Sequence, residues 1–341
     1  MTAICARCVM PETFPGISFN SDGICNHCQV APKLHEIEES RRALSAQIEE
    51  AVMEAKSSSE SDYDCVVAYS GGKDSSYTLY HLKEKFGLNL LAVTIDNGFL
   101  SEQAIVNSRK LTASLEIDFI LFAPKQSFMS NMYRQSLKRD DVHVKASITR
   151  ASNICNSCIN LINNQMITFA LRNKVNLIAG GYLGGQVPKD AAVMKIDIAQ
   201  QEVLRKKRLE KYRSAFGETA NQYFGIPPNL INSQNSIITI LNPMLTLLAT
   251  EEEIIEKISE FGWVKTKDTG NYSSNCKIND LGIMSHHRKY GFNPYIMEVA
   301  EGVRAGLLDR EKALKKLARR IEFEDVEKEA EAIGLNESDF E

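Results

Sequence analysis

The sequence lacks the long apolar runs that are typical of membrane proteins. No segment approaches the roughly 18 consecutive apolar residues by which a membrane-spanning helix is recognised. The first residues, MTAICARCVM, also lack the basic region and the apolar core of a secretory signal peptide. We therefore expect a cytoplasmic protein with no membrane partner, in which clustered cysteines bind metal or react rather than form disulfides.

The sequence also has little net charge of either sign. Its 40 basic and 44 acidic residues leave a formal net charge of −4, which is too small to require nucleic acid or an anionic membrane as a partner. One basic segment, LRKKRLEKYR at 204–213, suits contact with tRNA, but a solvated helix face is the commoner role of such a segment. Internal repeats of solenoid length and long low-complexity segments are absent as well.

What the 341 residues do contain is an alternation of short apolar runs and helical patterns. The composition, 43% hydrophobic and 25% charged, is ordinary for a globular protein of about two domains. Buried parallel strands are predicted at 64–70, 88–96, 117–123 and 175–181, and helices between them at 74–87, 100–115 and 157–174. The sequence therefore predicts an α/β fold with a doubly wound parallel sheet.

The chain divides into four predicted segments. Residues 1–32 hold four cysteines and few apolar residues, 33–60 form a helix and a Ser-rich linker, 61–248 contain the sheet domain, and 249–341 are mostly helical. Beyond Gly185 the sheet domain loses its regular pattern, and a charged helix at 201–213 is the main element predicted there.

The loop after the first predicted strand has the composition of a phosphate-binding loop. Gly71 and Gly72 let backbone N–H groups approach an anion, and the helix that follows adds a partial positive charge at its N-terminus. Lys73 adds a full charge, while Ser70 and Ser75 add hydroxyl groups. The spacing differs from the Walker A pattern. The alternative is an ordinary strand–turn–helix junction that contains two glycines.

The segment S-G-G-K-D-S at 70–75 resembles the PP-loop of the ATP pyrophosphatases, which place AMP on a substrate oxygen and release pyrophosphate. The resemblance implies an adenine nucleotide α-hydrolase-like fold and an enzyme that uses ATP and Mg²⁺. It also implies catalytic roles for Lys73 and Asp74. The residues that it assigns to the pyrophosphate portion of ATP and its Mg²⁺ are Ser70, Gly71, Gly72, Lys73, Asp74 and Ser75.

Two further strand ends are expected beside the nucleotide. By the same resemblance, Thr94, Ile95 and Asp96 at the end of the second strand are candidates for the adenine and ribose site. Asp96 also sits at a carboxyl end of a strand, where open sheets bind ligands, although it has an alternative role in forming the turn. Gly180 and Gly181 follow a later strand at the same edge and are further candidates.

Cys5, Cys8, Cys25 and Cys28 form a C-x2-C-x16-C-x2-C pattern. Two such pairs predict a structural zinc site, because four thiolates complete a tetrahedron around Zn²⁺. The metal would replace the core that residues 1–32 cannot build alone. The alternatives are an iron–sulfur cluster or a redox site.

The N-terminal CARCVMPETFPGISFNSDGICNHC, joined to S-G-G-K-D-S, also resembles the N-acetyl sugar amidotransferases, and the likeness extends to HHRKYGFNPYIMEVAEGVRAGLLDREKALKKL near the C-terminus. That resemblance implies an amidine product made with ammonia from a partner glutaminase, and this sequence has no glutaminase-like segment of its own. The segment GGYLGGQVPKDAAVMK at 180–195 matches no pattern of that family, and we expect acceptor choice to lie there.

Three more cysteines resemble the ligand set of the tRNA 2-thiouridine synthetases, which belong to the same superfamily. Cys155, Cys158 and the distant Cys276 correspond to three thiolates that hold a [4Fe-4S] cluster with one open iron, so they are also catalytic candidates. The alternatives are a redox disulfide with an unrelated Cys276, or a second zinc. Cys65, in an apolar strand, is expected to be a buried small side chain.

The favoured hypothesis is therefore ATP-dependent adenylation of a carbonyl or amide oxygen, followed by its replacement with sulfur from a sulfide donor. The acceptor would be a small molecule or, less favoured, tRNA, and a homodimer is compatible with the sequence. The first alternative is transfer of nitrogen from a glutaminase partner. The second is a regulator that binds ATP without chemistry.

Overall fold

The computed structural model describes residues 3–58, 61–231 and 236–340, so part of the predicted Ser-rich linker, at 59–60, lies outside the described residues. The described chain contains one six-stranded sheet in the order β3-β2-β1-β4-β6-β5. Its strands are β1 (Cys65–Ala68), β2 (Leu90–Ile95), β3 (Asp118–Phe122), β4 (Leu177–Ala179), β5 (Val193–Asp197) and β6 (Ile237–Leu241). All neighbouring pairs are parallel except β5 and β6, which are antiparallel.

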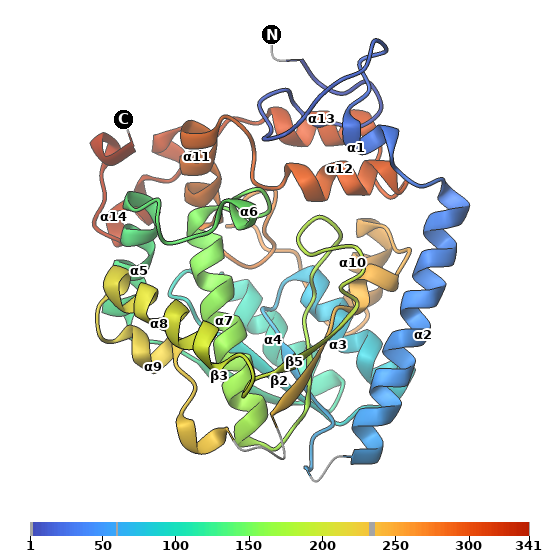
Figure 1. Cartoon of the computed structure of the whole chain (residues 1–341), viewed down its shortest axis with the longest axis vertical. Coiled ribbons are helices and arrows are strands. Elements are labelled where there is room, and N and C mark those ends of the chain that lie inside the picture. The colour runs from blue at the N-terminus through green and yellow to red at the C-terminus, as the bar shows by residue number, and fades with distance from the viewer. Residues whose placement is uncertain (1–2, 59–60, 232–235, 341) are drawn as a thin grey trace.

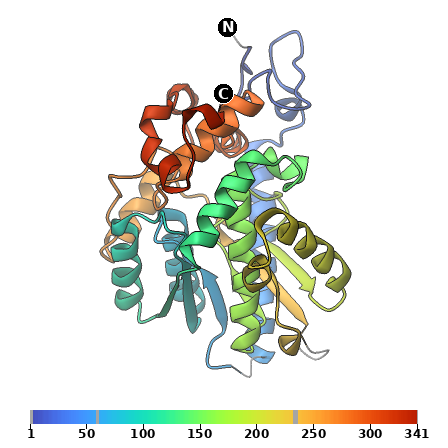
Figure 2. The ribbon, with the colours of Figure 1, turned by 90° about the vertical axis from the view of Figure 1, so that its left-hand side faces the viewer.

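The sheet is covered by helices on both faces (Figure 2). Alternate residues of each strand enter opposite cores, since Val66 packs into one cluster and Val67 into the other. The first face is covered by α2 (Leu34–Ser58), α3 (Lys73–Phe86) and α4 (Glu102–Ser114). The second is covered by α5 (Gln126–Lys138), α7 (Asn153–Arg172), α8 (Glu202–Phe216) and α9 (Ala220–Phe224). The predicted doubly wound α/β fold is thereby confirmed.

The strand order reverses between β1 and β4, which are neighbours in the sheet although α3, β2, β3 and α7 separate them along the chain. The connections leave this point in opposite directions. In open α/β sheets the carboxyl ends of the strands at such a point are where ligands bind. β5 and β6, which the sequence did not predict, extend the sheet on the β4 side.

The N-terminal cysteine segment packs on helices from the far end of the chain (Figure 1). The C-terminal region contains α10 (Glu251–Ser259), α11 (Asn279–Tyr290), α12 (Ile296–Arg304), α13 (Arg310–Ala318) and α14 (Glu327–Ala332). Val9 and Phe14 share one buried cluster with Phe292 and Val299. The short helices α1 (Asn26–Gln29) and α6 (Lys145–Ile148) complete the α-helices assigned in the described chain.

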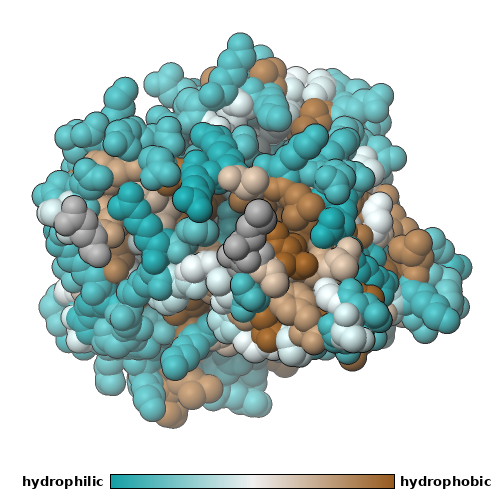
Figure 3. All heavy atoms as spheres, turned by 90° about the horizontal axis from the view of Figure 1, so that it is seen from above, coloured by the Kyte–Doolittle hydropathy of each residue, from teal (hydrophilic) through white to brown (hydrophobic). Residues whose placement is uncertain are grey.

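Hydrophilic side chains cover much of the face seen from above, with apolar patches between them (Figure 3). Within the described residues, no helix combines the length and the apolar character that crossing a membrane would require.

Candidate functional site

The predicted phosphate loop joins β1 to α3 at the switch point of the sheet. Gly71 has a φ of +72°, and a Cβ there would lie 2.2 Å from the carbonyl oxygen of Ala104 in α4. The Trp263 indole N–H donates a hydrogen bond of 2.9 Å to the carbonyl oxygen of Gly71. The loop is therefore clamped between two elements, and only glycine is compatible with the position of residue 71.

We expect Gly71→Ala to lower the free energy of unfolding by at least about 3 kcal/mol, because left-handed backbone strain and a steric clash add at one residue. Gly87→Ala is the matched control, since Gly87 also has a positive φ, +57°, but open space where a Cβ would stand. That variant should lose only about 1 kcal/mol. Chemical denaturation of both variants measures the difference, and equal losses would contradict the steric argument.

The polar groups of the loop are arranged around the first turn of α3. The Ser70 and Ser75 hydroxyls lie 3.0 Å apart, and Lys73 Nζ lies 2.9 Å from both carboxylate oxygens of Asp74. Burial lowers the pKa of Lys73, but the Asp74 and Glu251 carboxylates outweigh this effect and raise it above its ordinary value. Lys73 is therefore a cation at neutral pH, as binding of a polyphosphate requires.

The loop after β4 lies directly against the phosphate loop. A Cβ on Gly181 would stand 2.9 Å from the backbone nitrogen of Ser75, and one on Gly180 would stand 2.9 Å from the Tyr182 ring. Of the predicted pair, the structure thus places Gly181 against the N-terminus of α3, where a side chain would clash with the backbone, and Gly180 beside Tyr182.

The end of β2 holds the predicted residues Thr94, Ile95 and Asp96. The Thr94 hydroxyl is buried and donates to the carbonyl oxygen of Tyr69 at 2.6 Å, and Ile95 is buried in the core. The Asp96 carboxylate accepts from the Gly98 backbone N–H at 2.9 Å, which is the turn-forming role of the alternative reading. A nucleotide role for these three residues stays a prediction.

The four N-terminal cysteines form a closed metal-binding geometry. Their sulfur atoms all lie within 4.8 Å of one another, and Cys8 Sγ and Cys25 Sγ lie 3.7 Å apart. Burial raises the pKa of Cys5, but hydrogen bonds from the backbone N–H groups of Cys8 and Cys25 outweigh it and lower the pKa to about 6. Four buried thiols with such N–H···S contacts suit a tetrahedral metal ion.

Two arginines dock this cysteine site on the C-terminal helices. Arg304 of α12, whose side chain is only 3% exposed, donates to Cys8 Sγ at 3.5 Å and pairs with Glu301 at 3.0 Å. Arg310 of α13 donates to the carbonyl oxygens of Cys8 and Cys5, each at 2.9 Å. The positive charge of Arg304 is suited to compensating the net negative charge of a metal held by four thiolates.

The second group of cysteines, which we call the thiol trio (Cys155, Cys158 and Cys276), lies at the carboxyl edge of the sheet. Cys155 and Cys158 stand in the first turns of α7, whose start is capped where the Ser152 hydroxyl accepts from the Cys155 backbone N–H at 3.2 Å. The helix N-terminus adds a partial positive charge near Cys155, yet burial raises the pKa of this thiol above its ordinary value.

Cys276 is held beside Cys155 and Cys158 by backbone hydrogen bonds between its segment and residues 99–100. It forms an isolated antiparallel bridge with Leu100, and the Lys277 N–H donates to the carbonyl oxygen of Phe99 at 2.9 Å. Two residues earlier, the Ser274 hydroxyl accepts from the Lys73 backbone N–H at 2.9 Å. One short segment therefore touches both the phosphate loop and the thiol trio.

Amide side chains connect the members of the trio. Asn97 Nδ2 lies 3.3 Å from Cys276 Sγ and 3.8 Å from Cys158 Sγ, and Asn279 Nδ2 lies 3.5 Å from Cys155 Sγ. The three predicted residues are thus brought together although they are far apart in sequence.

The trio does not have the geometry of the N-terminal site. Among the described residues, the N-terminal cysteines form a group whose ligand atoms are close enough together to hold a single metal ion, and the trio does not form such a group. The thiolates of an iron–sulfur cluster bind different irons. Burial raises the pKa of Cys158 to about 11 and that of Cys276 to about 12, so in the absence of a positive partner both are neutral thiols.

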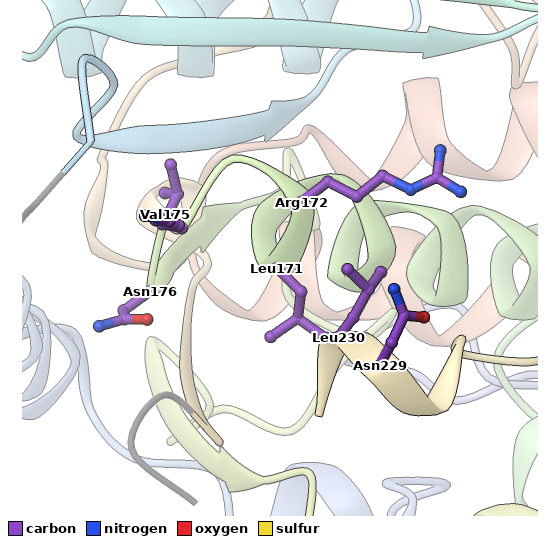
Figure 4. A pocket seen from close by; sticks show the side chains of 7 residues that line it. Leu171, Arg172, Val175, Asn176, Asn229 and Leu230 are labelled. Atoms are coloured by element: carbon purple, nitrogen blue, oxygen red, sulfur yellow. The ribbon is translucent and has the colours of Figure 1, made fainter. Parts of the chain in front are cut away.

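Cys65 takes no part in either cysteine group. It is fully buried in β1, as expected of a small apolar side chain. A shallow pocket elsewhere, between the end of α7 and the short 3-10 turn η1 (Pro228–Leu230), lies toward the opposite edge of the sheet and contains none of the predicted site residues (Figure 4).

Sequence reasoning missed Asn97 and Asn279, although both carry local signals. Asn97 stands between the strand-end Asp96 and Gly98, as a turn former would, and Asn279 stands three residues after Cys276. Amide donors that contact thiols cannot be distinguished from turn formers until the partner sulfur is located in space.

Comparison with known proteins gives one match to a family and one relative over nearly the whole chain. Residues 64–185 match the family model of the queuosine biosynthesis protein QueC. An uncharacterized protein of Methanocaldococcus jannaschii is 26% identical over 333 residues, which cover 97% of this chain and 99% of that protein.

Three solved structures show a looser likeness. The U34-tRNA thiolase NcsA of Methanococcus maripaludis, determined with its [4Fe-4S] cluster, is 17% identical with a TM-score of 0.36, covering 95% of this chain and 91% of its own. An NH3-dependent NAD synthetase of Campylobacter jejuni is 13% identical with a TM-score of 0.30, covering 69% and 99%. A predicted tRNA methyltransferase subunit of Methanocaldococcus jannaschii is 14% identical with a TM-score of 0.31, covering 68% and 90%.

These TM-scores are too low to establish a common fold, so the assignment comes from the matched segment and from the site. The matched residues contain β1, the S-G-G-K-D-S loop, β2, β3 and β4, which are the elements that form the switch point. With the mostly parallel sheet and the strand–loop–helix junction that carries S-G-G-K-D-S, the match of residues 64–185 fits the PP-loop ATP pyrophosphatase superfamily.

Proposed function

We propose that the protein adenylates a carbonyl or amide oxygen of its acceptor with ATP and then replaces that oxygen with sulfur. The observation that carries the proposal is the segment that contains Ser274 and Cys276. Ser274 contacts the phosphate loop and Cys276 joins the thiol trio, and at most about 7 Å of backbone separates two residues that are two positions apart. Activation and displacement would thus occur at adjacent places.

The residues of the trio suit a [4Fe-4S] cluster with one open iron. Cys155, Cys158 and Cys276 would hold it, and it would supply a sulfide poised for transfer. The Tyr133 hydroxyl is fully buried beside these thiols and interacts with Cys158. This hydroxyl, together with the amides of Asn97 and Asn279, is suited to the sulfur atoms of a bound cluster.

The chain itself would perform the ATP half-reaction by positioning and by charge. Lys73 and the N-terminus of α3 would hold the departing pyrophosphate, and Asp74 would bind its Mg²⁺. Adenylation converts a poor leaving oxygen into a phosphate ester, which the sulfur nucleophile can displace as AMP. For the N-terminal site (Cys5, Cys8, Cys25 and Cys28) we propose zinc with a purely structural role, because four thiolates leave it no open position.

Anaerobic reconstitution with iron and sulfide tests the proposal. We expect about four irons per chain, absorbance near 400 nm, and AMP formation with one of two acceptor probes, UDP-N-acetylglucosamine as the small molecule or unfractionated tRNA. Cys276→Ala should lose both the iron and the transfer of sulfur. Cys65→Ala is the control, because it removes a buried thiol that lies outside the trio.

A different outcome would favour the nitrogen-transfer alternative. If iron does not bind, or if Cys276→Ala transfers normally, the sulfur proposal is wrong. AMP formation with UDP-N-acetylglucosamine and ammonium chloride in the absence of iron would then identify an amidotransferase. Failure to form AMP with every probe, despite ATP binding, would favour the regulator. We propose a small molecule as the acceptor and a separate protein as the sulfide donor.

A further inference from the structure

Glu298, in the first turn of α12, lies where the phosphate loop and the thiol trio approach each other. Its carboxylate interacts electrostatically with Lys73 and Asp74 of the phosphate loop. Tyr295, three residues earlier in the chain, interacts electrostatically with both Glu298 and the Cys155 thiol. A residue of the C-terminal helices therefore reaches the space between the two parts of the proposed site.

A hydrogen-bonded loop fixes the position of this carboxylate. Gln186 Nε2 donates to Glu298 Oε2 at 2.7 Å, and Gln186 Oε1 accepts from the Leu183 backbone N–H at 3.0 Å. The orientation of the Gln186 amide is thereby set, with its donor toward the carboxylate. A Cβ on Gly185 would stand only 2.5 Å from the backbone nitrogen of Glu298, so the loop after β4 lies directly on the first turn of α12.

The surroundings make this carboxylate more basic than an ordinary one. Burial raises the pKa of Glu298, Asp74 raises it further, and Lys73 and the hydrogen bond from Gln186 oppose these effects without cancelling them. The Glu298 side chain is half-buried, so part of it remains accessible to a ligand. The charged and titratable groups that interact with it are Lys73 and Asp74 of α3, Lys316 of α13, Tyr272 of the connection between α10 and α11, and Tyr295 at the start of α12.

Other carboxylates near the loop are less suited to accepting a proton. Asp74 is held by Lys73 through both of its oxygens, and Glu251, which also lies 3.9 Å from Lys73, has a side chain that is 46% exposed. Within the described part of the chain, Glu298 Oε1 accepts no hydrogen bond, so it is free to receive a proton from a ligand.

We propose that Glu298 is the general base that takes the proton from the acceptor's amide nitrogen during adenylation. The inference rests on the proposed function. The acceptor's carbonyl oxygen attacks the α-phosphorus of ATP, the bond to pyrophosphate breaks, and pyrophosphate leaves with the electron pair. The amide N–H bond gives its electrons to a new C=N bond, and its proton goes to Glu298. This step is the same whether sulfur or nitrogen later displaces AMP.

Glu298→Gln tests the inference, because it keeps the size and the hydrogen-bonding capacity of the side chain but cannot accept a proton. We expect AMP formation, with whichever of the two acceptor probes the wild type uses, to fall by about 10²–10⁴-fold in kcat. The Kd for ATP should change little. Glu298→Asp, which retains a carboxylate, should recover part of the rate.

The pH profile separates a base from a structural residue. The wild-type rate should rise with pH through the pKa of Glu298, because only the ionised carboxylate accepts a proton, and this rise should be absent in Glu298→Gln. Glu251→Gln is the control, since it also removes a carboxylate beside Lys73 and should change kcat less than about threefold. If wild type and Glu298→Gln form AMP at similar rates, Glu298 is not the base and the proposed function stands. If the wild type forms no AMP with either probe, the role of Glu298 and the proposed function are both wrong.

Discussion

Replacing Lys73 by alanine is expected to reduce AMP formation by at least about 10²–10³-fold, which is the usual cost of removing one preorganised group that stabilises developing charge. Lys73 lies 2.9 Å from Asp74 and remains a cation despite its burial. In the reaction the Lys73 ammonium group would exchange the Asp74 carboxylate for the departing pyrophosphate as its ionic partner. Asp74→Asn should cause a comparable loss, because the neutral amide binds Mg²⁺ poorly.

The fold should survive both changes. Lys73 and Asp74 are neighbours at an N-terminus of a helix that packs through Leu79 and Leu82, and those contacts are not altered. Lys83→Ala, in the last turn of the same helix, is the matched control and should leave AMP formation unchanged. The measurement is the initial rate of AMP formation at saturating ATP. Thermal unfolding measured in parallel separates a loss of catalysis from a loss of stability. Normal turnover by either Lys73→Ala or Asp74→Asn would show that the loop does not bind the phosphates.

The parts of the site that were predicted from sequence are those whose signal is local. The S-G-G-K-D-S loop carries its own glycines, charge and hydroxyls within six residues, and the strand and helix beside it follow from periodicity. The four N-terminal cysteines are likewise recognised from their spacing. The grouping of Cys155, Cys158 and Cys276 came from a family resemblance, since no periodicity relates residues so far apart.

The parts that were missed depend on distant contacts. β6 is an apolar run, but it follows a long irregular connection and pairs with β4, which lies some sixty residues earlier. β5 is a half-buried edge strand whose direction is set only by its pairing with β6. Glu298 is one of many acidic residues in the C-terminal helices, and only the packing of α12 on the loop at Gly185 distinguishes it.

Loss of the proposed zinc is expected to release the N-terminal segment from the protein. In small metal sites the free energy of metal binding is largely free energy of folding, and for structural zinc it reaches about 10–16 kcal/mol at pH 7. Residues 3–32 have little core beyond the four cysteines, Val9, Met10 and Phe14. Cys25→Ser should therefore lose about one zinc per chain and make the first thirty residues sensitive to protease.

The Cys25→Ser substitution should also affect the proposed active site, because α12 connects that site to the N-terminal cysteines. Arg304 at the end of this helix contacts Cys8, and Glu298 at its beginning faces the phosphate loop, so the cysteine site and the proposed base are held by one rigid element. Without the metal, the buried Arg304 loses its thiolate partner, and the position of α12 depends on fewer contacts. We expect Cys25→Ser to lower AMP formation in addition to zinc content, whereas Cys65→Ala should lower neither. Unchanged zinc in Cys25→Ser would exclude the metal assignment, and lost zinc with full activity would show that the N-terminal site does not position α12.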